Sequence, residues 1–172
     1  MKVIIAGGGI GGMSAALALL LKGIDVEVHE QASELKEVGA GIQISPNGCR
    51  ALDALGVFHT LKELSCDPVR KEFRLWNTGK AWPLFDLGKS AIDKYGYPYL
   101  TVYRPDMLDT LTNAVRALKP DAIQLGSRAA GFVQDDTSAT LLLADGRKIT
   151  GDVLIGADGW RSVIRNTLWG EC

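Results

Sequence analysis

The residues in this sequence best suited to chemistry lie in two glycine-containing segments far apart in the chain. The first is Gly7-Gly8-Gly9-Ile10-Gly11-Gly12, and the second is Gly156-Ala157-Asp158-Gly159. In the first segment, Gly7, Gly9 and Gly12 have the G-x-G-x-x-G spacing. Glycines at this spacing permit a sharp turn out of a strand, close approach of a pyrophosphate to the backbone, and tight packing of a helix on a sheet. The first segment therefore predicts a dinucleotide-binding site.

The elements that would position this loop are a strand, a helix and a second strand. Val3–Ala6 is a short apolar run typical of a buried parallel strand. A helix is predicted from Met13 to about Leu21, with its N-terminal amides facing the phosphates. A second strand over 26–28 ends at Glu30. A carboxylate there can accept hydrogen bonds from both hydroxyls of an adenosine ribose, and it would repel a 2′-phosphate.

Two other interpretations of the N-terminal segment stay open at this point. The glycines could form a turn that only packs. Alternatively, the segment could be a secretory signal peptide, with Lys2, an apolar run and Ala16-Leu17-Ala18 as a cleavage-like site. Against a signal peptide, the glycines interrupt the apolar run, and cleavage would remove the whole phosphate loop. No apolar run is long enough to cross a membrane.

Composition narrows the class of protein. The chain has 172 residues and a formal net charge of −1, which suits one domain with a sizeable core and offers no basic patch for nucleic acid. Cys49, Cys66 and Cys172 lack the spacing of metal ligands or of a disulfide framework, so no metal site is predicted. We expect a protein of the reducing cytoplasm that binds neither nucleic acid nor a membrane.

The segment after the second strand is rich in small residues. The backbone of Val38-Gly39-Ala40-Gly41-Ile42-Gln43 could lie against a flat ligand, or the segment could be a plain loop. Ser45-Pro46 is an N-cap residue followed by proline, which predicts a helix that runs to about Leu55 and ends at Gly56.

The middle of the chain contains a predicted hairpin and a tyrosine-rich stretch. Phe73–Trp76 and Ala81–Phe85 flank turn-forming residues. In the expected extended stretch that follows, four tyrosines either line an aromatic pocket or form one face of a strand. These are Tyr95, Tyr97, Tyr99 and Tyr103. A helix is then predicted from Arg104-Pro105 to about Leu118.

The C-terminal part begins with short strands and not with a further helix. Runs over 129–134, 139–144 and 147–150 are separated by turn signals, which predicts a three-stranded antiparallel meander. An ordinary nicotinamide-binding domain would instead alternate strands and helices. Val153–Ile155 is a further buried parallel strand, and Asp158 lies beyond its carboxyl end, where open α/β sheets bind ligands. A last helix follows.

Taken together, these motifs resemble the N-terminal part of the flavoprotein aromatic hydroxylases. These are single-component FAD-dependent monooxygenases, such as the salicylate and 3-hydroxybenzoate hydroxylases. The resemblance covers essentially the whole chain. It rests on Gly7–Gly12, Glu30, the run 37–43, Tyr103-Arg104-Pro105-Asp106, and Gly156-Ala157-Asp158-Gly159 with Arg161-Ser162.

The resemblance implies an α/β fold. It would be a Rossmann-like FAD-binding fold with a parallel sheet, an antiparallel meander as a crossover, and part of a substrate-domain sheet. Residues 1–70 would form the FAD-binding βαβ unit and flavin loop, residues 71–103 part of the substrate-binding sheet, and residues 104–172 the remainder of the FAD-binding domain. Family members are considerably longer, so we expect a fragment that lacks the C-terminal half of the family fold.

The resemblance also implies which residues bind the cofactor. They are Gly7, Gly9, Ile10, Gly11, Gly12, Glu30, Gln31, Ala40, Gly41, Ile42, Gln43, Arg104 and Asp158. Residues 9–12 would hold the FAD pyrophosphate, Glu30 its adenosine ribose, and residues 40–43 would run beside the flavin. Arg104 would contact the cofactor, or it is a surface arginine before a helix. Asp158 belongs to a motif implicated in FAD and NAD(P)H binding, or it forms an ordinary turn. Arg161 could simply cap a helix or pair with a carboxylate.

The implied activity uses NAD(P)H as reductant and O2 as co-substrate to hydroxylate a small aromatic acid or phenol. Two alternatives stay open: an FAD-dependent reductase or dehydrogenase on the same fold, and a catalytically inactive FAD-binding fragment. A homo-oligomer is a further expectation. No catalytic residue is assigned, because family members place their ring-activating groups mostly downstream. His29 and His59 fit structural roles.

Overall fold

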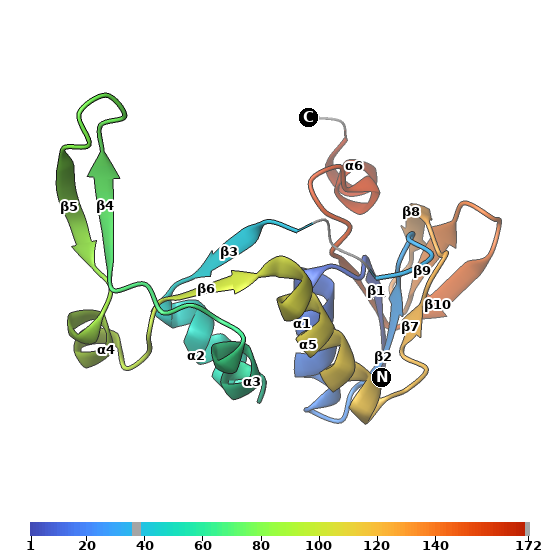
Figure 1. Ribbon diagram of the computed structural model, residues 1–172. Helices are drawn as coiled ribbons and strands as arrows, with labels where there is room; N and C mark the ends of the chain where they lie inside the picture. The colour runs from blue at the N-terminus through green and yellow to red at the C-terminus, as the bar shows by residue number, and fades with distance from the viewer. Residues whose placement is uncertain (36–38, 171–172) are drawn as a thin grey trace. The chain divides into compact units, whose positions relative to one another are not determined.

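The computed structural model describes residues 1–35 and 39–170 (Figure 1). The chain divides into two compact units. The first unit comprises residues 1–37 and 108–172, and the second comprises residues 38–107. The α/β class expected from the sequence is confirmed, since the first unit contains a parallel sheet and both units contain antiparallel strands. The functional ranges 1–70, 71–103 and 104–172 stay predictions.

The first unit is built on a four-stranded sheet in which every pairing is parallel and the strand order is β11-β1-β2-β7. Its strands are β1 (Lys2–Ala6), β2 (Asp25–His29), β7 (Ile123–Gln124) and β11 (Val153–Gly156). The apolar runs that predicted β1, β2 and β11 all lie in this sheet. Most of β1 and β2 is buried, as is typical of parallel strands, but β11 is only partly buried and Val153 is exposed, so the expectation of a buried strand is wrong for β11. The two-residue strand β7 carries no such run, and its position comes from pairing with β2.

Helix α1 (Ile10–Leu20) connects β1 to β2 and packs against both. It begins three residues before the expected start at Met13, so Gly11 and Gly12 belong to its first turn. Glycine has a low helix propensity, so the sequence pattern did not predict that these residues belong to the helix. Gly12 is needed here because a Cβ at that position would collide with the carbonyl oxygen of Gly7. Gly23, at φ +72°, follows the helix end as predicted.

The predicted meander is confirmed as a three-stranded antiparallel sheet in the order β10-β9-β8. Its strands are β8 (Ala129–Gln134), β9 (Ala139–Leu143) and β10 (Lys148–Gly151). A buried cluster joins the meander to β1 and to the last helix, α6 (Val163–Trp169). The cluster consists of Ile4, Ala6, Leu141, Leu143 and Ile164. The meander therefore covers one face of β1 and ends beside the strand that leads to Asp158.

In the second unit, β3 (Gly41–Ile44) pairs antiparallel with β6 (Leu100–Tyr103). Residues 41–43 of the small-residue segment are therefore a strand and not a plain loop. Its neighbour Val38 lies outside the described residues. Two predicted elements are confirmed in this region: helix α2 (Pro46–Ala54) and helix α5 (Arg104–Leu118), which continues into the first unit.

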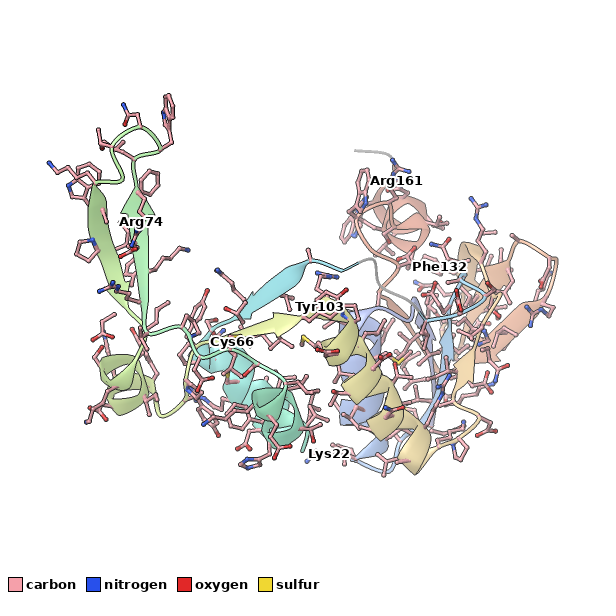
Figure 2. The ribbon with its side chains drawn as sticks, viewed as in Figure 1. Lys22, Cys66, Arg74, Tyr103, Phe132 and Arg161 are labelled. Atoms are coloured by element: carbon pink, nitrogen blue, oxygen red, sulfur yellow. The ribbon has the colours of Figure 1, made fainter. Side chains whose placement is uncertain are left out.

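The predicted hairpin is confirmed, as β4 (Arg70–Arg74) paired with β5 (Ala81–Asp86). Its first strand lies earlier than the predicted Phe73–Trp76, because Leu75 and Trp76 belong to the connection between the strands. The side chains of the hairpin are mostly exposed, as Figure 2 shows around Arg74. Two short helices were not expected, α3 (Phe58–Glu63) and α4 (Lys89–Tyr95). Because Tyr95 lies in α4, the expectation of one extended tyrosine stretch is wrong for that residue.

Candidate functional site

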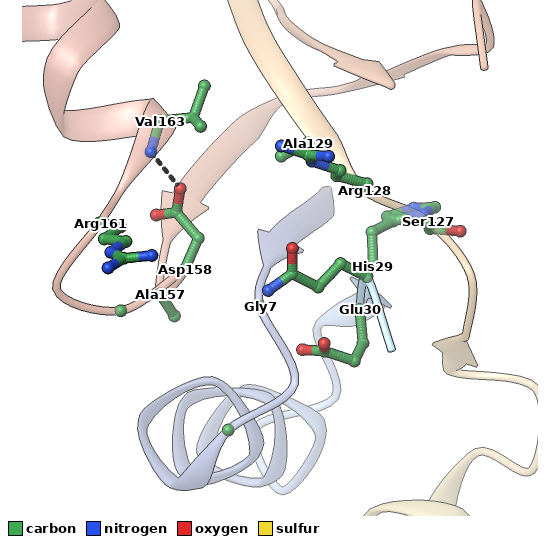
Figure 3. Close-up of a pocket in the computed structure, with 13 residues that line it drawn as sticks. Gly7, His29, Glu30, Ser127, Arg128, Ala129, Ala157, Asp158, Arg161 and Val163 are labelled. Atoms are coloured by element: carbon green, nitrogen blue, oxygen red, sulfur yellow. Dashed lines mark hydrogen bonds between the residues drawn. The ribbon is translucent and has the colours of Figure 1, made fainter. Parts of the chain in front are cut away.

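A cavity of about 410 Å³ lies at the carboxyl ends of the parallel strands in the first unit (Figure 3). This volume falls within the usual range for small-molecule sites. The residues that line it are Gly7, Gly9, His29, Glu30, Gln31, Ser127, Arg128, Ala129, Ala157, Asp158, Gly159, Arg161 and Val163. Five of the sequence-predicted cofactor residues are therefore brought together here: Gly7, Gly9, Glu30, Gln31 and Asp158.

The two glycine-containing segments meet at Gly7. This residue has φ +108°, and a Cβ at this position would collide with the carbonyl oxygen of Ala157. Backbone hydrogen bonds hold the junction, from the amide of Gly7 to the carbonyl of His29 (2.8 Å) and from the amide of Ala157 to the carbonyl of Ala6 (2.7 Å). Gly7 thus provides more than a turn, because it also lets the downstream segment approach the loop.

The N-terminus of α1 has the form of a phosphate site. Gly9 is the N-cap residue in an extended conformation, and no described side chain caps the helix. A Cβ built on Gly9 or Gly11 would meet no atom within 4 Å. The loop backbone is therefore open to a ligand, and the helix dipole favours an anion there. Ile10, Gly11 and Gly12 form the first turn, so this part of the site fits a pyrophosphate.

Glu30 follows β2 and takes part in holding the loop. Its Oε2 accepts a hydrogen bond from the amide of Gly8 (2.6 Å), and its Oε1 accepts one from the amide of Ala32 (2.8 Å). The carbonyl of Glu30 in turn accepts a hydrogen bond from the amide of Ser127 (2.7 Å). A carboxylate has about four acceptor sites, so two are left for ribose hydroxyls. This loop-holding role could not be read from the spacing of the motif.

Asp158 organises the start of α6. One carboxylate oxygen accepts a hydrogen bond from the Ser162 hydroxyl (2.5 Å), and the other accepts hydrogen bonds from the amides of Val163 (2.7 Å) and Ile164 (3.2 Å). Figure 3 shows the bond between Asp158 and Val163. The Ser162 hydroxyl accepts a bond from the amide of Arg165 (2.9 Å), which makes Ser162 the N-cap. Asp158 therefore fixes the turn beside the cavity, and its contact with a cofactor stays a prediction.

His29 is the buried histidine of the first unit, with 3% of its surface exposed. Its Nε2 lies 3.5 Å from Glu27 Oε2, and neither ring nitrogen has a hydrogen-bond partner among the described residues. Burial lowers the pKa of His29, while Glu27 acts in the opposite direction. The imidazole therefore belongs to the interior beneath the cavity, in keeping with its expected structural role.

The other predicted cofactor residues lie together in the second unit. The amide of Arg104 donates a hydrogen bond to the carbonyl of Ala40 (3.2 Å), and Gly41, Ile42 and Gln43 continue into β3. The Tyr99 hydroxyl donates to Gln43 Oε1 (2.9 Å). The strand therefore has a defined position within its unit. Glu37 and Val38, from the same sequence run, lie outside the described residues.

Motif spacing did not predict five further lining residues, which are His29, Ser127, Arg128, Ala129 and Val163. Arg161 also lines the cavity; it belongs to the motif that carries the resemblance but was assigned no cofactor contact. Ser127 and Arg128 directly precede β8 and Ala129 begins it, and the pairing of β7 with β2 brings this segment to the cavity. The predicted meander, which begins at residue 129, was the one feature of the sequence that could have indicated these residues. The Arg161 guanidinium lies over the ring of Trp160, 4.3 Å from its centroid. This contact is neither the helix cap nor the carboxylate pair that the sequence also allowed for Arg161.

The fold and the site together define a dinucleotide-binding domain of the flavoprotein type. The defining features are the parallel sheet, the glycine loop at the start of α1, the acidic residue after β2 and the meander. The chain belongs to the FAD binding domain family, whose model matches residues 1–170. This confirms both the family resemblance and FAD as the cofactor.

Known proteins agree with this membership. The chain is 34% identical to 3-hydroxybenzoate 6-hydroxylase of Polaromonas naphthalenivorans, over 99% of this chain and 43% of that protein. It matches the tetrameric form of 2-methyl-3-hydroxypyridine-5-carboxylic acid oxygenase with a TM-score of 0.83 and 32% identity, over 98% of this chain and 42% of the other. HpxO of Klebsiella pneumoniae, solved with FAD and uric acid, matches with a TM-score of 0.81 and 32% identity, over 96% and 41%.

The chain thus spans about two fifths of the length of these relatives, 41–43%. Among the described residues, no helix combines the length and the apolar character that crossing a membrane requires.

Proposed function

We propose that this chain is the FAD-binding part of an NAD(P)H-dependent flavoprotein monooxygenase that hydroxylates a small aromatic acid or phenol. The observation that supports this most strongly is the junction of Gly7 with Ala157, which lines one cavity together with Glu30. The named relatives act on small aromatic compounds, as their names state. The proposal extends that chemistry to the longer protein to which such a domain belongs.

Each residue of the proposed site has a physical task. The amides at the start of α1 hold the pyrophosphate, and Gly9 lets it approach the backbone. Glu30 accepts the ribose hydroxyls with its two remaining acceptor sites. In the second unit, residues 40–43 run beside the flavin ring and Arg104 contacts the cofactor. Asp158 keeps the turn at Gly159 in place at the edge of the cavity.

FAD would supply the redox chemistry, with NAD(P)H as reductant and O2 as co-substrate. This chain contributes binding, orientation and exclusion of water around the adenosine and pyrophosphate. Residues 71–103 would belong to the substrate-binding sheet, flanked by FAD-binding residues 1–70 and 104–172. We further propose that the protein works in the cytoplasm and forms a homo-oligomer, since one relative was solved as a tetramer.

The test of this function measures NAD(P)H oxidation and product together. The enzyme that contains this domain is incubated with FAD, NADH or NADPH, and a panel of hydroxybenzoates and hydroxypyridine carboxylates. The expected result is substrate-stimulated NAD(P)H oxidation with one hydroxylated product for each NAD(P)H consumed. NAD(P)H oxidation without any hydroxylated product would contradict the proposal and favour a reductase. FAD binding without any NAD(P)H oxidation would indicate an inactive FAD-binding module.

A further inference from the structure

The adenosine end of the cavity offers few flat surfaces for a purine ring. Of its lining residues, His29 has the one aromatic side chain, and 2% of that side chain is exposed. The remaining planar side-chain groups on the lining that carry no negative charge are the guanidinium groups of Arg128 and Arg161 and the amide of Gln31. A base is usually held by stacking on an aromatic ring or on an arginine. These planar groups are therefore the candidates to cover the adenine ring.

Arg128 is anchored next to the residue proposed to hold the ribose. The preceding residue, Ser127, donates its amide hydrogen to the carbonyl of Glu30 (2.7 Å). The carbonyl of Arg128 itself accepts a hydrogen bond from the amide of Ala144 (2.8 Å). The backbone at Arg128 is thus tied both to the end of β2 and to the meander. The Arg128 side chain is therefore attached to the backbone directly next to Ser127, the residue that is hydrogen-bonded to Glu30.

The side chain of Arg128 is directed toward the cavity and is exposed. In Figure 3 it extends from the start of β8 toward the segment that carries Asp158. None of the ion pairs found among the described residues involves Arg128, and a guanidinium is more weakly hydrated than an ammonium. It can therefore cover a flat ring without first giving up a carboxylate partner.

The other planar candidates are less suited to this task. The guanidinium of Arg161 already lies over Trp160, at 4.3 Å from the ring centroid. That cation–π contact would have to be lost before Arg161 could cover another ring. Gln31 offers an uncharged amide of smaller area.

From these relationships we propose that the Arg128 guanidinium stacks on the adenine ring of FAD and that Arg128 is a specificity residue for the adenosine half of the cofactor. This inference rests on the proposed function of the site. It adds a residue of the meander to a site otherwise formed by the glycine loop and Glu30.

The test compares FAD and ADP binding to the full chain and to three variants by isothermal titration calorimetry. Arg128→Ala removes the guanidinium, Arg128→Lys keeps the charge but not the plane, and Arg116→Ala removes an exposed arginine on α5 as control. Arg128→Ala is expected to weaken FAD and ADP by a similar factor, about tenfold, since both ligands carry the adenine. Arg128→Lys is expected to bind both ligands several-fold more weakly than the parent chain. Arg116→Ala is expected to bind them as tightly as the parent chain. Circular dichroism checks that each variant is folded.

Equal affinity of the parent chain and Arg128→Ala for both ligands would overturn the inference while leaving the proposed function intact. Full recovery in Arg128→Lys would also overturn it, because charge and not stacking would then explain the effect. A folded parent chain that binds neither FAD nor ADP would instead count against the proposed function. The two failures are therefore distinguishable.

Discussion

The carboxylate of Glu30 accepts a hydrogen bond from the backbone amide of Gly8 over 2.6 Å, so the residue proposed to hold the cofactor ribose also holds the glycine loop. The two roles are compatible because a carboxylate has more acceptor sites than this bond uses. They also make the loop and the ribose site mechanically dependent on each other. A change at Glu30 therefore acts on the cofactor in two ways.

Replacing Glu30 with alanine is expected to weaken FAD binding by about 1–3 kcal/mol, because the charge-assisted ribose hydrogen bonds are lost. The free energy of unfolding should also fall by about 1 kcal/mol, because the Gly8 and Ala32 amides lose their partner. Flavin titration and urea unfolding measure the two effects. Glu63→Ala, an exposed glutamate of α3, serves as control. FAD affinity unchanged in Glu30→Ala would refute the assignment of the ribose site.

Replacing Gly7 with alanine should destabilise the chain more than the same change at Gly23. Both residues have positive φ, which costs a non-glycine residue about 1–2 kcal/mol. At Gly7 the new Cβ also collides with the Ala157 carbonyl, whereas at Gly23 it meets no atom within 4 Å. Urea unfolding gives the loss of stability in each variant, and the difference between the two losses measures the effect of the close approach of the two glycine segments. Equal losses of stability would mean that the junction tolerates a side chain.

Replacing Asp158 with alanine should loosen α6. The change removes the acceptor for the Ser162 hydroxyl and for the amides of Val163 and Ile164, at an expected cost of about 1–3 kcal/mol. Amide hydrogen exchange of α6, together with urea unfolding, reports the effect. Asp136→Ala, in an exposed turn of the meander, is the matched control. Unchanged protection of α6 would show that Asp158 is not needed for the turn.

The stability of the chain should fall with acid through His29. Burial lowers the pKa of its imidazole from the ordinary value of 6.5, and the facing charges are Glu27, Lys2 and Arg147. The unfolded chain then binds the proton more readily. The free energy of unfolding that neutral, buried His29 contributes is therefore fully present above pH 6.5. It is lost as the pH falls through the lower pKa of the folded state. Urea unfolding at about pH 8 and about pH 5.5 measures the loss.

His29→Leu should reduce this pH dependence, while His59→Gln, at an exposed position after the start of α3, should leave it unchanged. The same slope in His29→Leu and the parent chain would assign the acid sensitivity to other groups.

Much of the fold could be predicted from local patterns. The loop at Gly7–Gly12, the meander strands and β11 each carry their own signal in periodicity or turn residues, and the structure contains them. The helices α3 and α4 were missed because they are short and depend on packing. Strand β7 was missed because two residues carry no period, so its existence follows from pairing with β2.

The candidate site was predicted less completely than the fold. Spacing indicates Glu30 and Asp158, because both follow strands. It does not reveal that Glu30 accepts a hydrogen bond from the Gly8 amide or that Asp158 accepts them from the first amides of α6, since these are contacts of the folded chain. Arg128 and Ser127 were missed for a related reason. They reach the cavity through the pairing of β7 with β2, which is a tertiary relationship and not a local one.

The measurement that tests the central claim most directly is a titration of the purified, folded chain with FAD, followed by visible absorption and by calorimetry, with Glu30→Ala beside it. We predict saturable binding at one FAD per chain, competition by ADP, and weaker binding in the variant. A folded chain that neither binds FAD nor binds ADP would contradict the account of the cavity as the adenosine and pyrophosphate site.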